Sequence, residues 1–176
     1  GLVGALIGGA LSRRSGGAPD RVWRGRLSLV ACGAIAPLLI VGGLVTSTAS
    51  GMAVPDWPNT FTSNMFLYPL GPRAAAGVYL EHAHRLFGSL IGLTTLTLLV
   101  CTLRLEWRRR RGVCILALTG FGLVCGQGIL GGVRVLQGHS TAAQDALEGR
   151  YYSMGHGILA QLVFGVFVAL AVVLAP

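Results

Sequence analysis

Lysine is absent from this chain, and charged residues of any kind are scarce. All 14 basic residues are arginine, only 6 residues are acidic, and charged residues make up 11% of the 176. A soluble domain carries about 25% charged residues. A composition that is 53% hydrophobic and so poor in charge therefore excludes an ordinary water-soluble protein and predicts an integral membrane protein.

The net charge of +8 does not indicate a nucleic-acid partner. The arginines gather beside apolar segments and have no aromatic residues interleaved with them, so the positive-inside rule explains them better. The 4 cysteines lie in or beside apolar segments, at spacings that suit neither a zinc site nor a disulfide framework. We expect no nucleic-acid binding, and we expect the cysteines to be packing residues.

Four apolar segments are each long enough to cross a membrane. A hydrocarbon core of about 30 Å needs about 20 consecutive, mostly apolar residues, and in lipid a helix satisfies all of its own backbone polar groups. The expected transmembrane helices cover about residues 27–47, 78–103, 112–136 and 151–176. The predicted fold class is an all-α membrane protein in which residues 27–176 form a four-transmembrane-helix bundle.

Residues 1–26 do not form a further span. Gly1–Leu11 is apolar but too short to cross a bilayer alone, and arginines follow it. We expect this piece to be the truncated tail of a preceding helix or an interfacial segment, followed by a basic cytoplasmic linker. The chain is accordingly expected to be a fragment.

The distribution of arginine predicts the orientation. Five arginines precede the first span and five lie between the second and third, whereas each of the other two loops holds one or two. Loops rich in arginine stay in the cytoplasm. Both chain ends and the 104–111 loop should therefore be cytoplasmic, in a multi-pass protein surrounded by the lipid of the bacterial cytoplasmic membrane.

Two histidines lie at matching depths in two spans that run in the same direction. His84 and His156 each lie near the outer end of their span, within about the first two helical turns. An ionisable residue inside a membrane is costly, so it marks a functional site by default. Two facing imidazoles are natural axial ligands for the iron of a haem held between helices, and we expect this role for His84 and His156.

Three neighbours of His84 are candidates for the same site. Gly88 lies one turn further on the same face, where it leaves room for a flat porphyrin or makes a close helix contact together with Gly92. Glu81 lies one turn earlier, where it could accept a proton or else extend to the lipid headgroups. Arg85 could pair with Glu81 or hold a haem propionate.

Of the three other polar residues near these spans, one is a possible cofactor contact and two are histidines that we place outside the site. Arg134, at the end of the third span, could also hold a propionate. His82 points about 200° away from His84 on the helix, so it should face the interface or a loop. His139 is placed in the outer loop and is given no role.

A short internal repeat divides the chain into two hairpins. Gly42-Gly43-Leu44-Val45 near the outer end of the first span echoes Gly131-Gly132-Val133-Arg134 near the outer end of the third. Each copy is followed by a loop and then by a histidine-bearing span. The first loop has proline on both sides of Asp56-Trp57, so we expect a rigid, non-helical lid over the ligands.

These features together resemble the haem A synthase family. The motifs that carry the resemblance are the glycine-rich stretch 42–51, the stretch 52–58 with Pro55-Asp56-Trp57-Pro58, Glu81-x-x-His84-Arg85, Gly131-Gly132 with Arg134, and His156. The resemblance implies the amino-terminal half of an eight-helix protein that oxidises a methyl group of haem O to the formyl group of haem A, for terminal oxidases. It also implies axial ligation by His84 and His156, a catalytic Glu81, and a haem b in the other half.

The sequence also departs from the family pattern and leaves alternatives open. It has no cysteine pair in the first outer loop, and Thr46 stands where other members have arginine. Haem O synthase, an electron donor and a second copy of the chain are the partners that the resemblance would suggest. A bis-histidine b-type cytochrome that only transfers electrons is the main alternative, and a haem-free protein with histidines bonded across helices is another. Glu81 favours the enzyme, because an electron carrier needs no carboxylate there.

Overall fold

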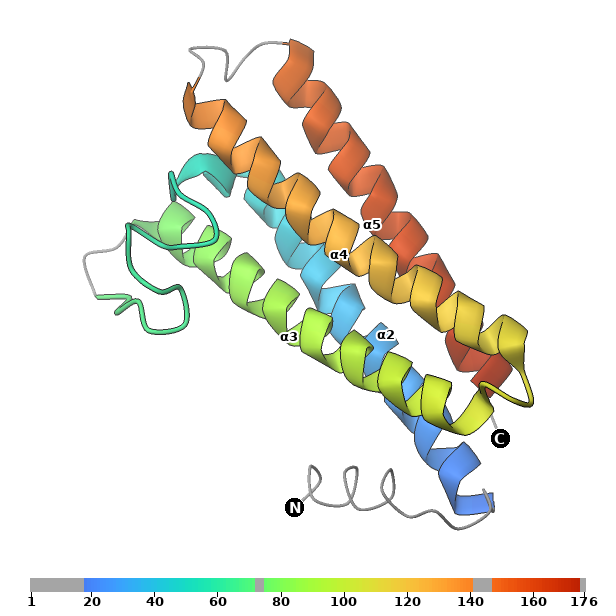
Figure 1. Ribbon diagram of the computed structural model, residues 1–176. Coiled ribbons are helices and arrows are strands. Elements are labelled where there is room, and N and C mark those ends of the chain that lie inside the picture. The colour runs from blue at the N-terminus through green and yellow to red at the C-terminus, as the bar shows by residue number, and fades with distance from the viewer. Residues whose placement is uncertain (1–17, 72–74, 141–146, 175–176) are drawn as a thin grey trace.

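The computed structural model describes residues 18–71, 75–140 and 147–174 (Figure 1). They form four long helices, α2 (Ala18–Ser47), α3 (Ala76–Glu106), α4 (Arg111–Ser140) and α5 (Leu147–Leu174), and one 3₁₀ turn, η1 (Ser50–Met52). The predicted character of residues 1–17 falls outside this described part.

Each long helix has a stretch that is apolar enough and long enough to cross a membrane. These stretches are Trp23–Ser47, Ala76–Glu106, Arg111–Gln137 and Arg150–Leu174. The predicted all-α bundle of four membrane helices is therefore confirmed.

The helices extend beyond the predicted spans. α2 begins nine residues before the predicted start at residue 27, and α4 continues to Ser140. The placement of His139 in a loop is thus wrong, since its backbone lies in the last turn of α4. The prediction counted only apolar residues, but helical backbone hydrogen bonding continues past the apolar stretch.

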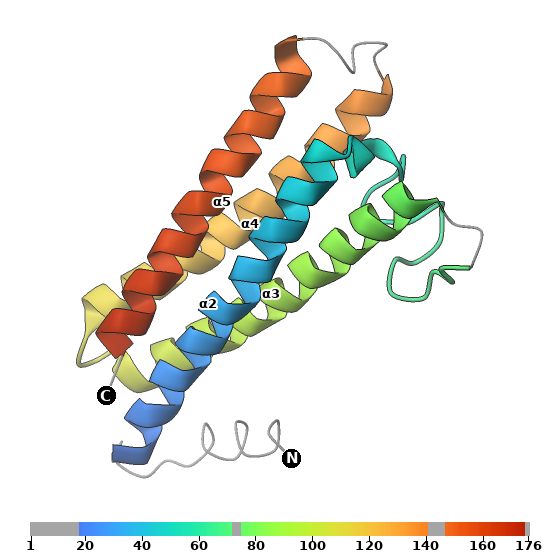
Figure 2. The same ribbon diagram turned by 180° about the vertical axis from the view of Figure 1, so that it is seen from behind.

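The four helices alternate in direction and form a square bundle. α2 packs against α3 and α5, and α4 packs against the same two helices (Figures 1 and 2). α3 and α5 therefore face each other across the diagonal and run in the same direction. We call the end with the α3–α4 turn at Trp107–Arg110 the arginine end, and the opposite end the histidine end.

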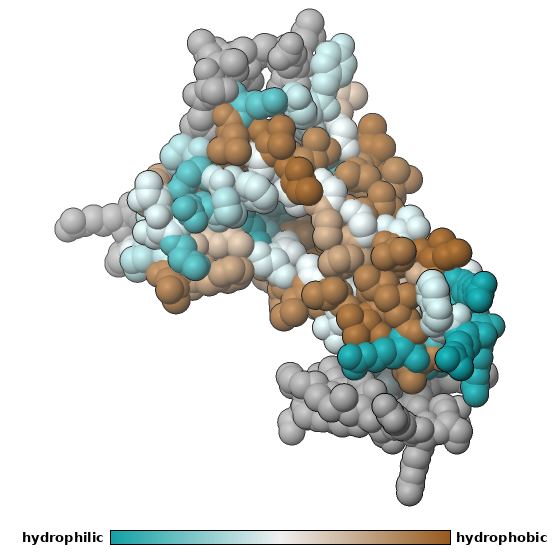
Figure 3. All heavy atoms as spheres, viewed as in Figure 1, coloured by the Kyte–Doolittle hydropathy of each residue, from teal (hydrophilic) through white to brown (hydrophobic). Residues whose placement is uncertain are grey.

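The apolar core lies between the middle of the bundle and the arginine end. Gly120 allows close packing there, because a Cβ atom at this position would lie 3.1 Å from Val166 and 3.2 Å from Phe167. Such contacts stabilise helix packing in lipid through van der Waals attraction. In Figure 3 apolar side chains cover most of the flank, and polar side chains gather at the arginine end and over the loop between α2 and α3. The buried core residues are Ala31, Ile35, Ile91, Leu98, Leu99, Val113, Ala117, Val163, Phe167, Leu170 and Leu174.

Polar contacts fasten the arginine end. Arg24 Nη2 and Glu106 Oε1 form a buried ion pair at 2.7 Å, which joins the start of α2 to the end of α3. Arg110 Nη2 donates to the carbonyl of Val173 at 3.0 Å and so ties the α3–α4 turn to the end of α5. These bonds hold one end of the bundle closed, whereas α4 and α5 diverge toward the other end (Figure 1).

Candidate functional site

Two imidazoles meet across the diagonal of the bundle at the histidine end. His84 comes from α3 and His156 from α5, and their ring centroids lie 6.5 Å apart with the ring planes at 67°. The structure thus brings together the two histidines that the sequence singled out. Both histidines lie outside the apolar core cluster, nearer the histidine end.

Each ring has a buried nitrogen without a partner. Nδ1 of His84 and Nδ1 of His156 are both buried and accept or donate no hydrogen bond among the described residues. An unsatisfied buried polar atom costs about 1–3 kcal/mol. The haem-free alternative required these histidines to bond across helices, and in the described part of the chain no hydrogen bond joins them. The pair is therefore suited to an added ligand.

The separation of the rings fits one metal atom between them. With metal–nitrogen bonds of about 2 Å and ring nitrogens roughly 1 Å from the ring centre, two imidazoles on opposite sides of a metal have centroids about 6 Å apart. The observed distance is 6.5 Å. No group of three histidine, cysteine or carboxylate side chains gathers as a metal site within the described ranges. The pair therefore suits a metal that brings its other ligands, as haem iron does.

Each imidazole rests against a glycine of the preceding helix. A Cβ atom at Gly42 of α2 would lie 3.0 Å from Cε1 of His84, and one at Gly131 of α4 would lie 3.1 Å from Cε1 of His156. Both are the first glycine of a Gly-Gly pair. The internal repeat seen in the sequence is therefore also a repeat of contacts.

Gly88 lies one turn beyond His84 and has open space beside it. A Cβ atom at Gly88, or at Gly92 a further turn along, would meet nothing within 4 Å. The close helix contact offered as the alternative reading of these glycines is therefore not formed. The room that a flat group would need on this face of α3 is present.

Glu81 is buried and does not reach toward the headgroups. Only 3% of its surface is exposed. Its Oε2 accepts a hydrogen bond from the backbone N–H of Val54 at 2.8 Å, and its Oε1 forms an ion pair with Arg85. The carboxylate thus lies inside the protein, one turn before His84, and is held from two sides.

Arg85 binds the loop that follows α2. Its Nη1 donates to the carbonyls of Asp56 at 2.7 Å and Asn59 at 2.9 Å, and its Nη2 donates to the carbonyl of Val54 at 3.1 Å and to Glu81. These bonds use all four hydrogens on the two Nη atoms. Of the two roles predicted for Arg85, the structure contains the pairing with Glu81, and a propionate would have to displace a loop carbonyl.

The rest of the loop is held by short-range polar contacts. The Asp56 carboxylate accepts from the N–H groups of Phe61 and Thr62, at 2.8 and 2.6 Å. His82 is 2% exposed, and its Nδ1 lies 3.2 Å from Thr60 Oγ1. His82 therefore faces the loop, as predicted. Between α2 and α3 the described chain is irregular except for η1, so the expected non-helical lid contains one 3₁₀ turn.

Arg134 places a cation beside the histidine pair. Its two Nη atoms would both lie 3.3 Å from a Cβ atom at Gly51, so the guanidinium lies over η1. It is within electrostatic range of Glu81, His84 and His156. Arg134 therefore lies where its guanidinium could meet an anionic group bound beside the histidine pair.

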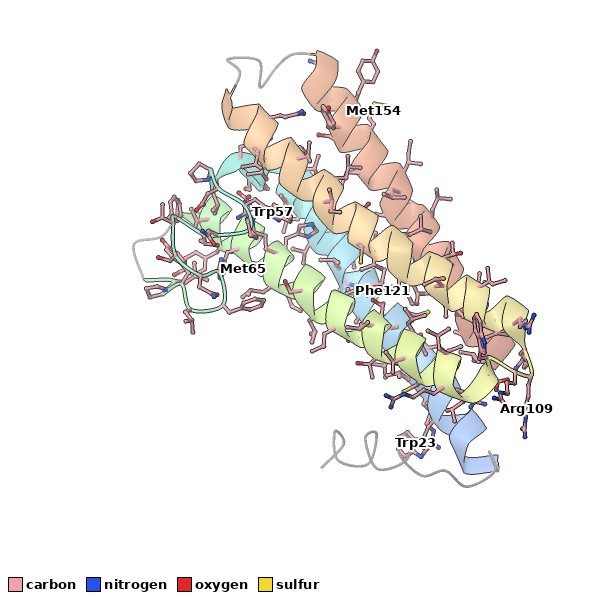
Figure 4. The ribbon with its side chains drawn as sticks, viewed as in Figure 1. Trp23, Trp57, Met65, Arg109, Phe121 and Met154 are labelled. Carbon is pink, nitrogen blue, oxygen red and sulfur yellow. The ribbon has the colours of Figure 1, made fainter. Side chains whose placement is uncertain are left out.

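Trp57 makes a contact that the sequence did not predict. A Cβ atom at Gly132 would lie 2.4–2.7 Å from Cδ2, Cε2 and Cε3 of the indole, so only glycine admits the ring. Figure 4 shows Trp57 reaching from the loop toward α4. Both residues belong to motifs noticed in the sequence, but nothing in the sequence pairs segments so far apart.

An open cavity of about 440 Å³ lies between the diverging parts of α4 and α5. It is lined by Leu130, Tyr151, Tyr152 and Gly155, and two of these directly precede Gly131 and His156. Gln127 Nε2 donates to the carbonyl of His156 at 2.9 Å and joins the two helices below the opening. The volume of this opening falls within the range of about 300–1,000 Å³ that is common for small-molecule sites.

Comparison with known proteins identifies a family. The COX15-CtaA family model, described as cytochrome oxidase assembly protein, matches residues 25–175. The matched region contains His84, His156, Glu81 and Arg134. A search of curated proteins and a search of solved structures found no match.

Proposed function

Because the chain belongs to the cytochrome oxidase assembly protein family, whose members act in haem A synthesis, we propose that it oxidises the methyl group of haem O to a formyl group. The histidine pair carries this proposal. His84 and His156 lie at a separation that suits axial ligation of one iron, and both keep a buried nitrogen without a partner. The chain would hold the substrate haem, as the amino-terminal half of the family does.

Glu81 is the proposed proton acceptor. Conversion of a methyl to a formyl group takes its oxygen atom from one water molecule and releases four protons and four electrons. The site therefore needs a base for the protons, and the electrons must leave to an acceptor. Glu81 is a buried carboxylate on the same helix face as His84. Its bonds to Val54 and Arg85 hold it in one place, as a positioned acid–base group requires.

Arg134 is the proposed partner of a haem propionate. Its guanidinium lies over η1, beside the histidine pair. A guanidinium can bind a carboxylate through two parallel hydrogen bonds. This role falls to Arg134 rather than Arg85, because the loop carbonyls and Glu81 already use the Nη hydrogens of Arg85.

The wider assignment follows the family plan. Electrons would leave through a haem b in a second four-helix half or in a second copy of the chain, and haem O synthase would supply the substrate. The arginine end would face the cytoplasm of a bacterium, because cytoplasmic loops are rich in arginine. A reporter fused after Arg110 should then give a cytoplasmic signal, and a periplasmic signal there would overturn this orientation.

The decisive experiment supplies haem O to the purified protein in lipid nanodiscs together with an electron acceptor. We expect a six-coordinate low-spin absorption spectrum, and haem A among the extracted haems by mass spectrometry. Absence of haem binding would refute the proposal. A normal low-spin spectrum with only haem O recovered, even with the second half or a second copy present, would favour the electron-transfer cytochrome.

A further inference from the structure

We propose that Gly42 and Gly131 are positioning residues that fix the two axial imidazoles in their crossed orientation. The inference rests on the proposed haem function and adds residues to it. Neither glycine touches the substrate in this account. Each acts through the histidine that it contacts, Gly42 through His84 and Gly131 through His156.

The contacts are the same in both hairpins. At Gly42 the three nearest side-chain atoms to an added Cβ are Cε1, Nδ1 and Nε2 of His84, at 3.0, 3.6 and 3.7 Å. At Gly131 they are the same three atoms of His156, in the same order, at 3.1, 3.7 and 3.9 Å. Two independent helix pairs thus place the Cε1 side of the imidazole ring against bare backbone.

Close packing of helices does not explain these glycines. All three nearest atoms at each position belong to the imidazole, whereas at Gly120 they belong to Val166 and Phe167 of the apolar core. The adjacent Gly43 would meet nothing within 4 Å, and neither would Gly128 on α4. The contact is therefore specific to the first glycine of each pair.

A methyl group added at Gly42 or Gly131 should weaken metal binding by the histidines more than it destabilises the fold. At 3.0–3.1 Å the imidazole would have to shift or turn by a few tenths of an ångström. A metal–nitrogen bond holds its imidazole at a distance of about 2 Å, so the loaded site resists this displacement. A ring without metal can turn away, and alanine is a better helix former than glycine.

The test compares Gly42→Ala and Gly131→Ala with the matched variants Gly43→Ala and Gly128→Ala. Haem titration should show about 10–100-fold weaker binding for the first two, the range found when groups that orient metal ligands are lost. The low-spin electron paramagnetic resonance signal should shift in both, because the angle between the imidazole planes sets its anisotropy. The thermal stability of the haem-free protein should be unchanged or raised, and the matched variants should resemble the wild type.

The possible outcomes distinguish failure of the glycine proposal from failure of the proposed haem function. A wild-type protein without a bis-histidine spectrum would refute the proposed function. A normal wild-type spectrum that stays unchanged, with unchanged affinity, in Gly42→Ala and Gly131→Ala would refute the inference alone. The proposal would also fail if the thermal stability of the two haem-free variants fell in proportion to their haem affinity. The glycines would then be needed for helix packing rather than for positioning the imidazoles.

Discussion

The hairpins α2–α3 and α4–α5 hold their histidines alike and differ in the charged groups around them. Three residues before His84 stands Glu81, but three residues before His156 stands Ser153. Three residues after Gly42 stands Val45, but three residues after Gly131 stands Arg134. The first hairpin thus contributes a carboxylate and the second a guanidinium. The two histidines are held alike, but the charged groups beside them differ.

The 3₁₀ turn η1 contacts both of these unlike positions, Val45 of the first hairpin and Arg134 of the second. A Cβ atom at Gly51 would lie 3.4 Å from Val45 and 3.3 Å from both Nη atoms of Arg134. The second glycines differ as well, because Gly43 is open while Gly132 lies against Trp57. The loop of the first hairpin therefore covers the second, which makes the two halves of the site interdependent.

Loss of either ligand should have the largest effect. We expect His84→Ala and His156→Ala each to abolish the six-coordinate low-spin spectrum or convert it to a five-coordinate one, because each removes one axial bond. Absorption spectroscopy of the purified variants checks this. His82→Ala is the control, since His82 faces Thr60, and its spectrum should stay nearly intact. If His82→Ala did the damage and His84→Ala did not, the pairing across the bundle would be wrong.

Glu81→Gln tests the carboxylate that only the first hairpin has. Haem should still bind, while haem A production falls by about 10²–10⁴-fold, the usual loss of an acid–base group. Ser153→Ala at the matching position should change the rate little. Product analysis of the extracted haems measures haem A production in both variants.

Arg85→Gln separates chemistry from loop anchoring. Like Glu81→Gln, this change breaks the ion pair between Glu81 and Arg85. It also removes three hydrogen bonds to loop carbonyls, but it leaves the Glu81 carboxylate in place. We expect a smaller loss of haem A than in Glu81→Gln. Equal losses in the two variants would assign Glu81 to holding the loop.

Arg134→Gln tests the guanidinium that only the second hairpin has. A charge-assisted hydrogen bond contributes about 1.5–3 kcal/mol, so haem affinity should fall by about 10–100-fold. Titration with haem dimethyl ester, which lacks propionate charges, should give similar affinities for the variant and the wild type. A tenfold difference that persists with the ester would exclude propionate binding by Arg134.

Gly132→Ala should have the smallest effect, and it tests how the loop couples the hairpins. The added methyl would displace the Trp57 indole, at a cost of about 1–3 kcal/mol in stability as for overpacking elsewhere. Gly43→Ala should be neutral, because nothing lies within 4 Å. Thermal unfolding of Gly132→Ala, Trp57→Ala and the double variant should be non-additive, and additive effects would show that the two residues act separately.

Much of the architecture was predictable because a membrane leaves few choices. A segment of about 20 apolar residues can cross lipid only as a helix, so composition alone predicted four helices and their alternation. The same directions placed His84 and His156 at one end. The helix ends were missed at Ala18 and Ser140, since backbone hydrogen bonding is indifferent to the polarity of the side chains there.

The sequence by itself determined the helices, their directions and the facing histidines, because spacing within one helix fixes face and depth. Only the tertiary structure decided what each neighbour does. It buried Glu81 against Val54, used Arg85 to hold a loop and set Trp57 on Gly132. These contacts join irregular chain to distant helices, and no periodicity relates the two. The shape of the folded loop selects such partners, so their roles become visible only when the chain is folded.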